Sequence, residues 1–348
     1  MPVGDLVSEW FETDLLRAAV AAHAIFGNPA GPRSAGTGAM LLGRVAADPI
    51  PVGSGITVRG GPGALSDAVA RIAAQHGASV LTNSRVTQVL LENGRATGVV
   101  FENGDTMQAR AVISAIAPKT TLTGLVPPTE LAPTLLQRAR NIRARGVTAK
   151  INLALDALPA FPALAGDTVP LGGRILIAPG LDYLERAFDA TKYGAMSEQP
   201  WLELTIPTVN DAALAPAGGH VMSIAVHFTP RHLRHTNWTD ARETLAASVM
   251  RVLEPHIPTL SHHIVGREII TPEDMEQRWG LPGGHIFHAE STLDQSWMAR
   301  PILGWAEYRT PIAGLYLASA GTHPGGGLTG LPGWLAAHTV ARDLKKRR

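Results

Sequence analysis

The chain has 348 residues, of which 45% are hydrophobic, and its formal net charge at pH 7 is +1. This length and apolar content predict a folded protein with one large or two ordinary cores, and the balanced charge gives no reason to expect nucleic acid as a partner. The chain has no cysteine, which excludes disulfides, thiolate metal sites and a cysteine nucleophile.

The N-terminal residues predict an amphipathic helix. The residues that recur at helical spacing are Leu6, Trp10, Phe11, Leu15 and Leu16. We expect them to pack on the body of the protein, with contact to a membrane surface as the alternative. The early acidic residues are unlike the basic start of a signal peptide, and no stretch reaches the roughly 18 to 20 apolar residues that span a bilayer. We therefore expect a cytoplasmic protein whose residues 1–55 form an N-terminal helical segment of a substrate domain.

The next segment predicts a strand, a loop, a helix and a second strand. Residues 56–59 are strand-like, and apolar residues at helical spacing over 65–73 predict the helix, which Gly77 closes. Residues 79–81 predict the second strand. Three glycines stand between the first strand and the helix: Gly60, Gly61 and Gly63.

A different pattern follows in residues 86–115. Apolar and polar residues alternate there, and the pairs Asn93-Gly94 and Asn103-Gly104 are turn signals between strand-like runs. This pattern predicts a three-stranded antiparallel meander that returns to the main sheet through the sequence AVISA. We assign residues 56–120 to one α/β domain with this meander.

The middle of the chain, residues 121–300, predicts a second body. Three long strand-like runs cover residues 147–161, 201–207 and 220–228, and a helix capped by Asp240 follows them. Another helix begins after Thr271, which we expect to be its N-cap. An antiparallel sheet with helices on one face suits a substrate domain.

Residues 301–348 predict a strand, a glycine-rich loop and a helix. The strand covers residues 315–319, six glycines lie between Gly321 and Gly333, and the helix starts near Gly333. Backbone N–H groups at a helix start attract electron-rich atoms, and glycines let a flat ring or a pyrophosphate approach the chain. The segment is either a ligand-binding loop or a surface loop without chemical consequence.

Three stretches of the chain carry a resemblance to a known family. They are residues 59–121, the sequence PGGHIFHAESTLDQSWMARP and the sequence GLYLASAGTHPGGGLTGLPG. In matching order they resemble the phytoene-dehydrogenase-like FAD flavoproteins, in the branch called pyridine nucleotide-disulphide oxidoreductase domain-containing protein 2. The resemblance implies the amine-oxidase type of FAD fold, which is a mixed α/β class. Here it predicts an incomplete FAD/NAD(P)-binding Rossmann-like domain, with residues 56–120 as the partial FAD-binding domain with its β-meander, plus an antiparallel-sheet substrate domain.

The resemblance also implies positions for the cofactor FAD. Val86 matches the place that meets the adenine end, and Leu335 stands where relatives often have asparagine. The positions that match flavin contacts in the last glycine loop are Gly321, Thr322, His323, Gly325, Gly326, Gly327 and Gly330. The glycines that fall near the flavin or the substrate channel are Gly60, Gly61 and Gly63.

One family motif does not occur in this sequence. Family members begin with a strand, a G-x-G-x-x-G turn and a helix that bind the pyrophosphate, and no such turn follows a strand in the first fifty residues. Three interpretations are open: an FAD oxidoreductase whose dinucleotide segment is missing or lies on a companion chain, a flavin-free homologue that binds hydrophobic ligands or acts without redox chemistry, and a non-catalytic partner subunit or homo-oligomer.

Three polar residues are candidates for the cavity, and no catalytic residue is assigned. They are His288, Glu290 and His323. A strand would place His288 and Glu290 on one side, where they could bind a metal, but no third ligand is local, so we expect structural or hydrogen-bonding roles and no metal. Tryptophans in the last quarter are compatible with an apolar tunnel for a small hydrophobic substrate, which flavin chemistry would oxidise, desaturate or isomerise.

Overall fold

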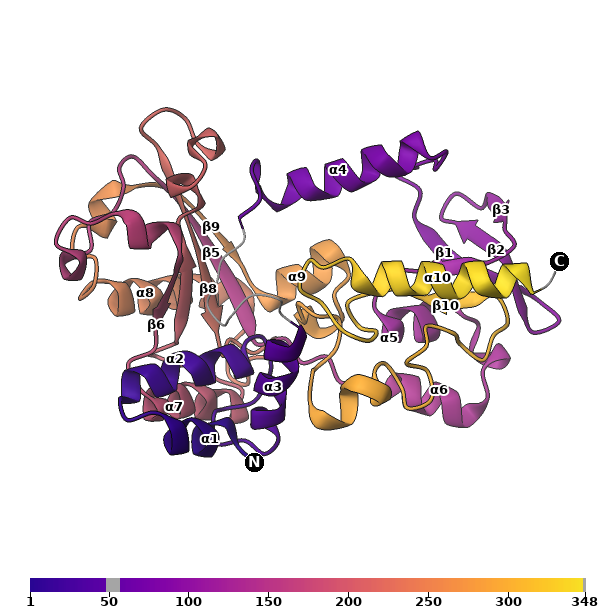
Figure 1. The fold of residues 1–348 in the computed structure, drawn as a ribbon, viewed down its shortest axis with the longest axis horizontal. Helices are drawn as coiled ribbons and strands as arrows, with labels where there is room; N and C mark the ends of the chain where they lie inside the picture. The colour runs from indigo at the N-terminus through magenta and orange to yellow at the C-terminus, as the bar shows by residue number, and fades with distance from the viewer. Residues whose placement is uncertain (48–56, 347–348) are drawn as a thin grey trace. The chain divides into compact units, whose positions relative to one another are not determined.

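The computed structural model describes residues 1–47 and 57–346. They form a mixed α/β fold with several sheets, as the sequence predicts (Figure 1). The chain divides into two compact units. The first unit combines Met1–Val80 with Gly146–Met275, and the second combines Leu81–Arg145 with Glu276–Arg348.

A five-stranded antiparallel sheet forms the centre of the first unit. Its strand order is β6-β7-β8-β5-β9. The predicted strands within residues 147–161, 201–207 and 220–228 are confirmed as β5, β7 and β8. The bounds are β5 Thr148–Leu155, β6 Arg174–Ile177, β7 Leu202–Thr205, β8 His220–His227 and β9 Ile264–Ile270.

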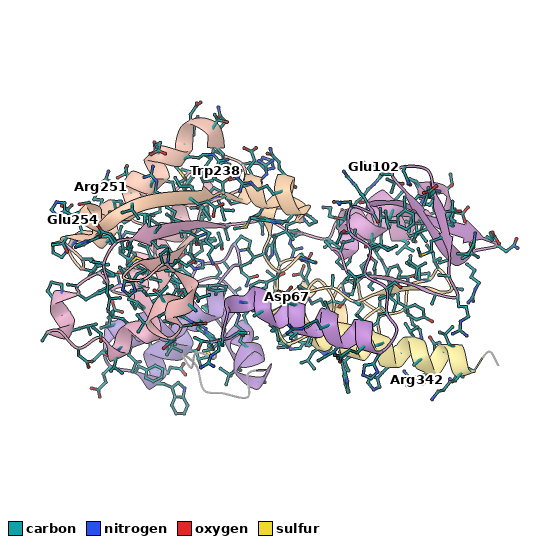
Figure 2. All side chains as sticks on the ribbon, turned by 90° about the horizontal axis from the view of Figure 1, so that it is seen from above. Asp67, Glu102, Trp238, Arg251, Glu254 and Arg342 are labelled. Carbon is teal, nitrogen blue, oxygen red and sulfur yellow. The ribbon has the colours of Figure 1, made fainter. Side chains whose placement is uncertain are left out.

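One face of this sheet is apolar and is covered by helix α8 (Trp238–Leu253). Alternate residues of β5 and β8 point to that face, and Ile151 pairs with Ile224 across the two strands. Trp238, labelled in Figure 2, is 2% exposed and belongs to the same core. The predicted arrangement of an antiparallel sheet with a covering helix is therefore confirmed.

The two helices after the sheet strands begin at side-chain caps. Asn237 is the N-cap of α8 because its side chain accepts a hydrogen bond from the backbone N–H of Asp240. The prediction of Asp240 as the cap is wrong by one turn. For α9 (Pro272–Trp279) the predicted cap is confirmed, since the Thr271 hydroxyl accepts from the N–H of Asp274 at 3.1 Å, and the Asp274 carboxylate accepts from the N–H of Thr271.

Four helices form a second core in the first unit. The predicted N-terminal helix is divided in two, and its predicted apolar face is confirmed only in part: Leu6 and Phe11 pack against this core, but Trp10 is 76% exposed. Val7 and Ala18, which were not predicted, are buried. No helix among the described residues is long and apolar enough to cross a membrane. The four helices are α1 Val3–Trp10, α2 Asp14–Ile25, α3 Thr37–Ala47 and α7 Leu181–Lys192.

Helix α4 (Gly61–Gln75) is an unusual element of the first unit. None of its residues is buried, and Val69 and Ile72 are more than half exposed. Asp67 marks this helix in Figure 2, where side chains extend from it in several directions. The predicted strand over residues 79–81 does not form, because no neighbouring strand among the described residues pairs with it. Of the predicted strand 56–59, residue 56 lies outside the described residues and the others are not in a strand.

The predicted meander is the three-stranded sheet of the second unit. Gly94 and Gly104 have φ values of +73° and +87° in the two predicted turns, which only glycine adopts readily. The return strand through AVISA is β4, and it pairs in parallel with β10. The bounds are β1 Val86–Glu92, β2 Arg95–Phe101, β3 Thr106–Gln108, β4 Val112–Ser114 and β10 Leu315–Leu317.

Residues 121–145 and 276–300 cluster with the second unit, although we expected them in the substrate domain. The reason is packing: Leu122 and Leu135 are buried against Val89 and Leu315 in one core. The helices of this unit are α5 Pro118–Thr120, α6 Pro133–Arg140 and α10 Leu331–Lys345. Short segments, the first a π-helix and the others 3-10 helices, connect the elements: Thr121–Leu125, Pro128–Glu130, Pro162–Leu164, Val169–Gly172, Pro207–Val209, Ala212–Leu214, Leu260–His263, Pro282–Gly284, Leu293–Gln295 and Trp297–Ala299.

Candidate functional site

The glycine loop, defined as residues 320–330, joins β10 to α10 in the second unit. The strand before it is buried, with Leu315 and Leu317 each 1% exposed, so the start of the loop is fixed by the core. The loop ends at Gly330, the N-cap of α10, where φ is +67°. The predicted order of strand, loop and helix is confirmed, but the strand ends at Leu317 instead of residue 319 and the helix begins at Leu331, two residues before Gly333.

Glycine occupies positions of this loop for two different physical reasons. A Cβ added to Gly321 would lie 2.4 Å from Cδ of Pro118, and one added to Gly326 would lie 2.8 Å from the ring of Phe287, so packing requires glycine there. At Gly325 and Gly327 φ is +117° and +129°, and a Cβ would meet no atom closer than 3.8 Å. A Cβ at these two residues would therefore make only ordinary van der Waals contact, and the left-handed backbone is the reason for glycine there.

Thr322 and His323 hold the loop rather than extend from it. The hydroxyl of Thr322 is buried and donates a hydrogen bond to the backbone oxygen of Ser319 at 2.7 Å. The hydroxyl of Tyr308 donates to the backbone oxygen of His323 at 2.9 Å. Burial and, after it, the positive charge of Arg300 lower the pKa of His323, so this imidazole is neutral at pH 7.

The histidine segment, defined as residues 285–290, is not a strand, so the expected alternation of His288 and Glu290 along a strand is wrong. The backbone turns there because His288 has a φ of +64°. Burial lowers the pKa of His288, and it lowers the pKa of His285, which is 0% exposed, to about 3. Both rings are neutral at pH 7. A Cβ on Gly321 would lie 3.3 Å from that of His288, so the segment lies against the glycine loop.

Glu290 is fully buried and bound by arginines. Nε of Arg145 donates to its carboxylate at 2.7 Å, and Nε of Arg143 donates at 3.3 Å. Burial alone would raise the pKa of Glu290, but the hydrogen bonds and charges of Arg145 and Arg143 outweigh it and lower the pKa. These contacts use the carboxylate to fix the segment. In the described part of the chain, no group of three or more histidine and acidic side chains is placed to hold a metal ion.

Arg300 is a buried residue at this site that the sequence analysis did not select. It is 3% exposed, and its guanidinium donates to backbone oxygens of both the histidine segment and the glycine loop, including Ala320 at 2.7 Å. Burial lowers its pKa to about 10, so it remains charged at neutral pH. No sequence pattern predicted its burial, because the carbonyl groups that bind it come from separate segments.

The other predicted positions lie on other elements. Gly60 and Gly61 precede and begin α4 in the first unit, where the N–H of Gly60 donates to Asp211 at 2.7 Å and both glycines have a φ of +79°. Gly63 lies in the first turn of the same helix, and nothing lies within 4 Å of the place a Cβ would take. Val86 is the first residue of β1 in the second unit.

A cavity of about 360 Å³ lies in the second unit, and none of the predicted site residues lines it. Ile142, Arg143 and Ile302 contribute to its wall. Of the tryptophans in the last quarter, Trp279 and Trp334 are more than half exposed, whereas Trp305 packs against the core of the second unit.

Comparison with known proteins identifies relatives over nearly the whole chain. The chain is 38% identical to pyridine nucleotide-disulfide oxidoreductase domain-containing protein 2 of Rattus norvegicus, over 99% of this chain and 61% of that protein. It is 27% identical to the lycopene-forming phytoene desaturase of Pantoea ananas, over 94% of this chain and 63% of that protein. The chain thus spans about three fifths of the length of these curated relatives.

The same fold is found in solved structures. An oxidoreductase from Methanosarcina mazei superimposes with a TM-score of 0.65 at 16% identity, covering 98% of this chain and 68% of that one. Residues 12–344 match the family described as flavin containing amine oxidoreductase. Since this match includes both units and the glycine loop, the chain belongs to the flavin-containing amine oxidoreductase family.

Proposed function

We propose that this chain forms the flavin-ring side and the substrate side of an FAD-dependent oxidoreductase. The observation that carries the proposal is the glycine loop, which lies against the histidine segment and has a left-handed backbone without close side-chain contacts at Gly325 and Gly327. A side chain at either residue would strain the backbone and cover the chain on that side. The residues therefore fit a flat ligand that approaches the backbone closely.

Unpaired polar atoms next to the loop support the same ligand. Within residues 1–47 and 57–346, three buried side-chain atoms of this region have no hydrogen-bond partner: Nε2 of His285, Nδ1 of His288 and Nε of Arg300. Buried polar atoms are normally paired, and each unpaired one costs about 1 to 3 kcal/mol. A ligand with nitrogen and oxygen atoms in a ring would satisfy such atoms.

FAD, when bound, would accept two electrons from the substrate. The protein residues would bind and orient the two reactants: the glycine loop gives access to the ring, and the buried histidine segment excludes water from one side of it. The neutral imidazoles can donate or accept a hydrogen bond without adding charge. We propose a hydrophobic organic substrate that is dehydrogenated, desaturated or isomerised, which the similarity to phytoene desaturases supports.

We further propose that the pyrophosphate and adenosine are bound by a Rossmann-type segment with a G-x-G-x-x-G turn, carried by a companion chain or by a longer form of this polypeptide. The described β4–β10 pair would be part of the sheet of that domain. Val69 and Ile72 of α4 are exposed apolar residues that such a segment would cover. The share of the rat relative that the chain covers, 61%, leaves length for this segment.

Titration with FAD tests this function. Flavin fluorescence and absorbance from 300 to 550 nm are recorded with the chain alone and with a β–α–β segment of a relative added. Saturable binding in either arm supports the proposal. Absence of binding in both arms refutes it and favours a flavin-free protein, to be tested with apolar ligands.

A pair of variants separates loss of the site from loss of folding. Gly325→Val changes the glycine loop, and Gly304→Val is the matched control, because Gly304 also has a positive φ, +94°, with nothing within 4 Å of an added Cβ. Both valines strain the backbone by about 1 to 3 kcal/mol. Only Gly325→Val is expected to weaken FAD binding, by tenfold or more. Equal losses in the two variants would contradict the assignment of the loop.

A further inference from the structure

The guanidinium of Arg300 is a buried cation with a particular set of partners. Nη1 donates to the backbone oxygens of Glu290 and Gln295, and Nη2 donates to those of Phe287, Ala289 and Ala320, at 2.7 to 3.4 Å. All five acceptors are neutral carbonyl groups. The two Nη groups are therefore fully used in joining three segments of the second unit.

The charge of Arg300 has no opposite charge beside it. Among the described residues it takes part in no ion pair, and the nearby carboxylate of Glu290 is bound by Arg143 and Arg145 instead. Burying a charge without a counter-charge costs several kcal/mol, which carbonyl dipoles offset only in part. A buried cation in this position is better explained if an anion joins it in another state of the protein.

The one free donor of this side chain lies next to the glycine loop. Nε of Arg300 is buried without a hydrogen-bond partner, and it lies 4.0 Å from the place where a Cβ of Gly325 would be. A phosphate is usually held by both Nη groups in a fork, and here that fork is occupied. What remains is one N–H donor with a full positive charge, which suits a single acceptor atom of a ring rather than a pyrophosphate.

The histidines around Arg300 add no competing charge. The pKa of His285, of His288 and of His323 is lowered, mainly by burial and also by the charge of Arg300. The three imidazoles are therefore neutral at pH 7. Glu290 is charged, but it is paired with Arg143 and Arg145, so Arg300 is the cation that contacts the glycine loop itself.

We propose that Arg300 is a positioning residue of the glycine loop whose buried charge stabilises the reduced, anionic form of a flavin bound there. This inference rests on the proposed function. Reduction by the substrate adds two electrons and one proton to the neutral ring and leaves one negative charge on it. A cation fixed at the loop binds that form more tightly than the oxidised form and raises the midpoint potential of the flavin.

The test compares the midpoint potential of bound FAD, measured by equilibration with a reference dye, in wild type, Arg300→Met and Arg300→Lys. We expect Arg300→Met to weaken the binding of reduced flavin at least tenfold more than it weakens the binding of oxidised flavin. This difference lowers the midpoint potential by about 30 mV or more for two electrons. Arg300→Lys keeps the charge, so it should retain most of the potential although it loses the fork. The apo-protein melting temperature, which does not depend on FAD, should fall in both variants.

Arg309→Met is the matched control. Arg309 also joins a loop to another element of the second unit, but its charge is balanced by the carboxylates of Asp343 and Glu307. The Arg309→Met variant should therefore have a lower melting temperature and an unchanged midpoint potential of bound FAD. Equal potentials in Arg300→Met and wild type overturn the inference. If Arg300→Met does not fold, the lysine variant decides alone, and a potential of bound FAD in that variant as low as that of free FAD overturns the inference.

The outcome for the inference can be separated from the outcome for the proposed function. Wild type that binds FAD, with a potential that Arg300 does not influence, overturns the inference alone. Wild type that binds no FAD, with or without the added β–α–β segment, overturns both. A drop in FAD affinity without a change in potential would mean that Arg300 binds the pyrophosphate, which also contradicts the inference.

Discussion

Replacement of Asp274 by asparagine should destabilise the first unit, and the structure gives the size of the effect. Nη1 and Nη2 of Arg242 donate to the two carboxylate oxygens at 2.6 and 2.7 Å, and the N–H and hydroxyl of Thr271 donate to one of them at 2.8 Å. Burial alone would raise the pKa of Asp274, but these hydrogen bonds outweigh it and lower the pKa from 3.8 to about 2.

This difference in pKa converts into stability. Each tenfold difference in proton affinity is worth about 1.4 kcal/mol, so the folded state gains about 2 kcal/mol from the ionised carboxylate of Asp274. Because the folded pKa is the lower one, the gain is complete above pH 4 and disappears as the pH falls from about 4 to 2. Asp274→Asn should therefore cost about 2 kcal/mol at pH 6 and progressively less below pH 4.

Urea unfolding followed by tryptophan fluorescence measures this loss, since Trp201 and Trp238 are both buried in the first unit. Asp240→Asn is the control, because Asp240 occupies the same third position of helix α8, but its carboxylate is exposed. The control should change stability by less than about 0.5 kcal/mol. A loss in Asp274→Asn that is equal at pH 6 and pH 3, or no larger than the control, would refute the reasoning.

Three further predictions concern other parts of the molecule. Glu290→Gln should lower the free energy of unfolding of the second unit by about 1.5 to 3 kcal/mol, because it weakens the hydrogen bonds between a buried carboxylate and two partly exposed arginines, whereas Asp294→Asn on the exposed side of Arg143 should cost much less in the same urea titration. His285→Asn should weaken the pH dependence of stability between pH 6.5 and about 3. The folded protein keeps this imidazole neutral while acid protonates it in the unfolded chain, so the wild type loses stability as the pH falls through this range. An unchanged pH profile of the melting temperature would contradict this. The double variant Val69→Lys and Ile72→Lys should leave the melting temperature of this chain within about 2 °C of wild type, since both residues are exposed. In the fluorescence titration it should abolish the effect that the added β–α–β segment has on FAD binding.

Elements specified by local chemistry were predicted well from the sequence. The turns at Asn93-Gly94 and Asn103-Gly104 require a positive φ, and that requirement can be identified from the residues alone. The alternation in residues 220–228 similarly identifies a strand with one buried face. The cap of α8 was harder, because Asn237 and Asp240 are both good caps and only the structure shows which one accepts the hydrogen bond.

Features that depend on distant partners were not predictable in this way. A strand over residues 79–81 needs a neighbouring strand, and none is present among the described residues. The apolar spacing of α4 correctly predicts a helix but not that Val69 stays exposed. The burial of Arg300 depends on carbonyl groups from the histidine segment and the glycine loop, so no local pattern marks it.

The parallel pairing of β4 with β10 has a consequence for the order in which the protein is made. Val112 pairs with Leu315, about 200 residues later in the chain. All segments of the first unit have been synthesised once Met275 is added, and they emerge from the ribosome before β10 does, but the second unit needs residues beyond β10. During translation the sheet with its covering helix can fold first. The unit that carries the glycine loop can close only when its final strand emerges, so a cofactor held by that loop would be acquired late in biosynthesis.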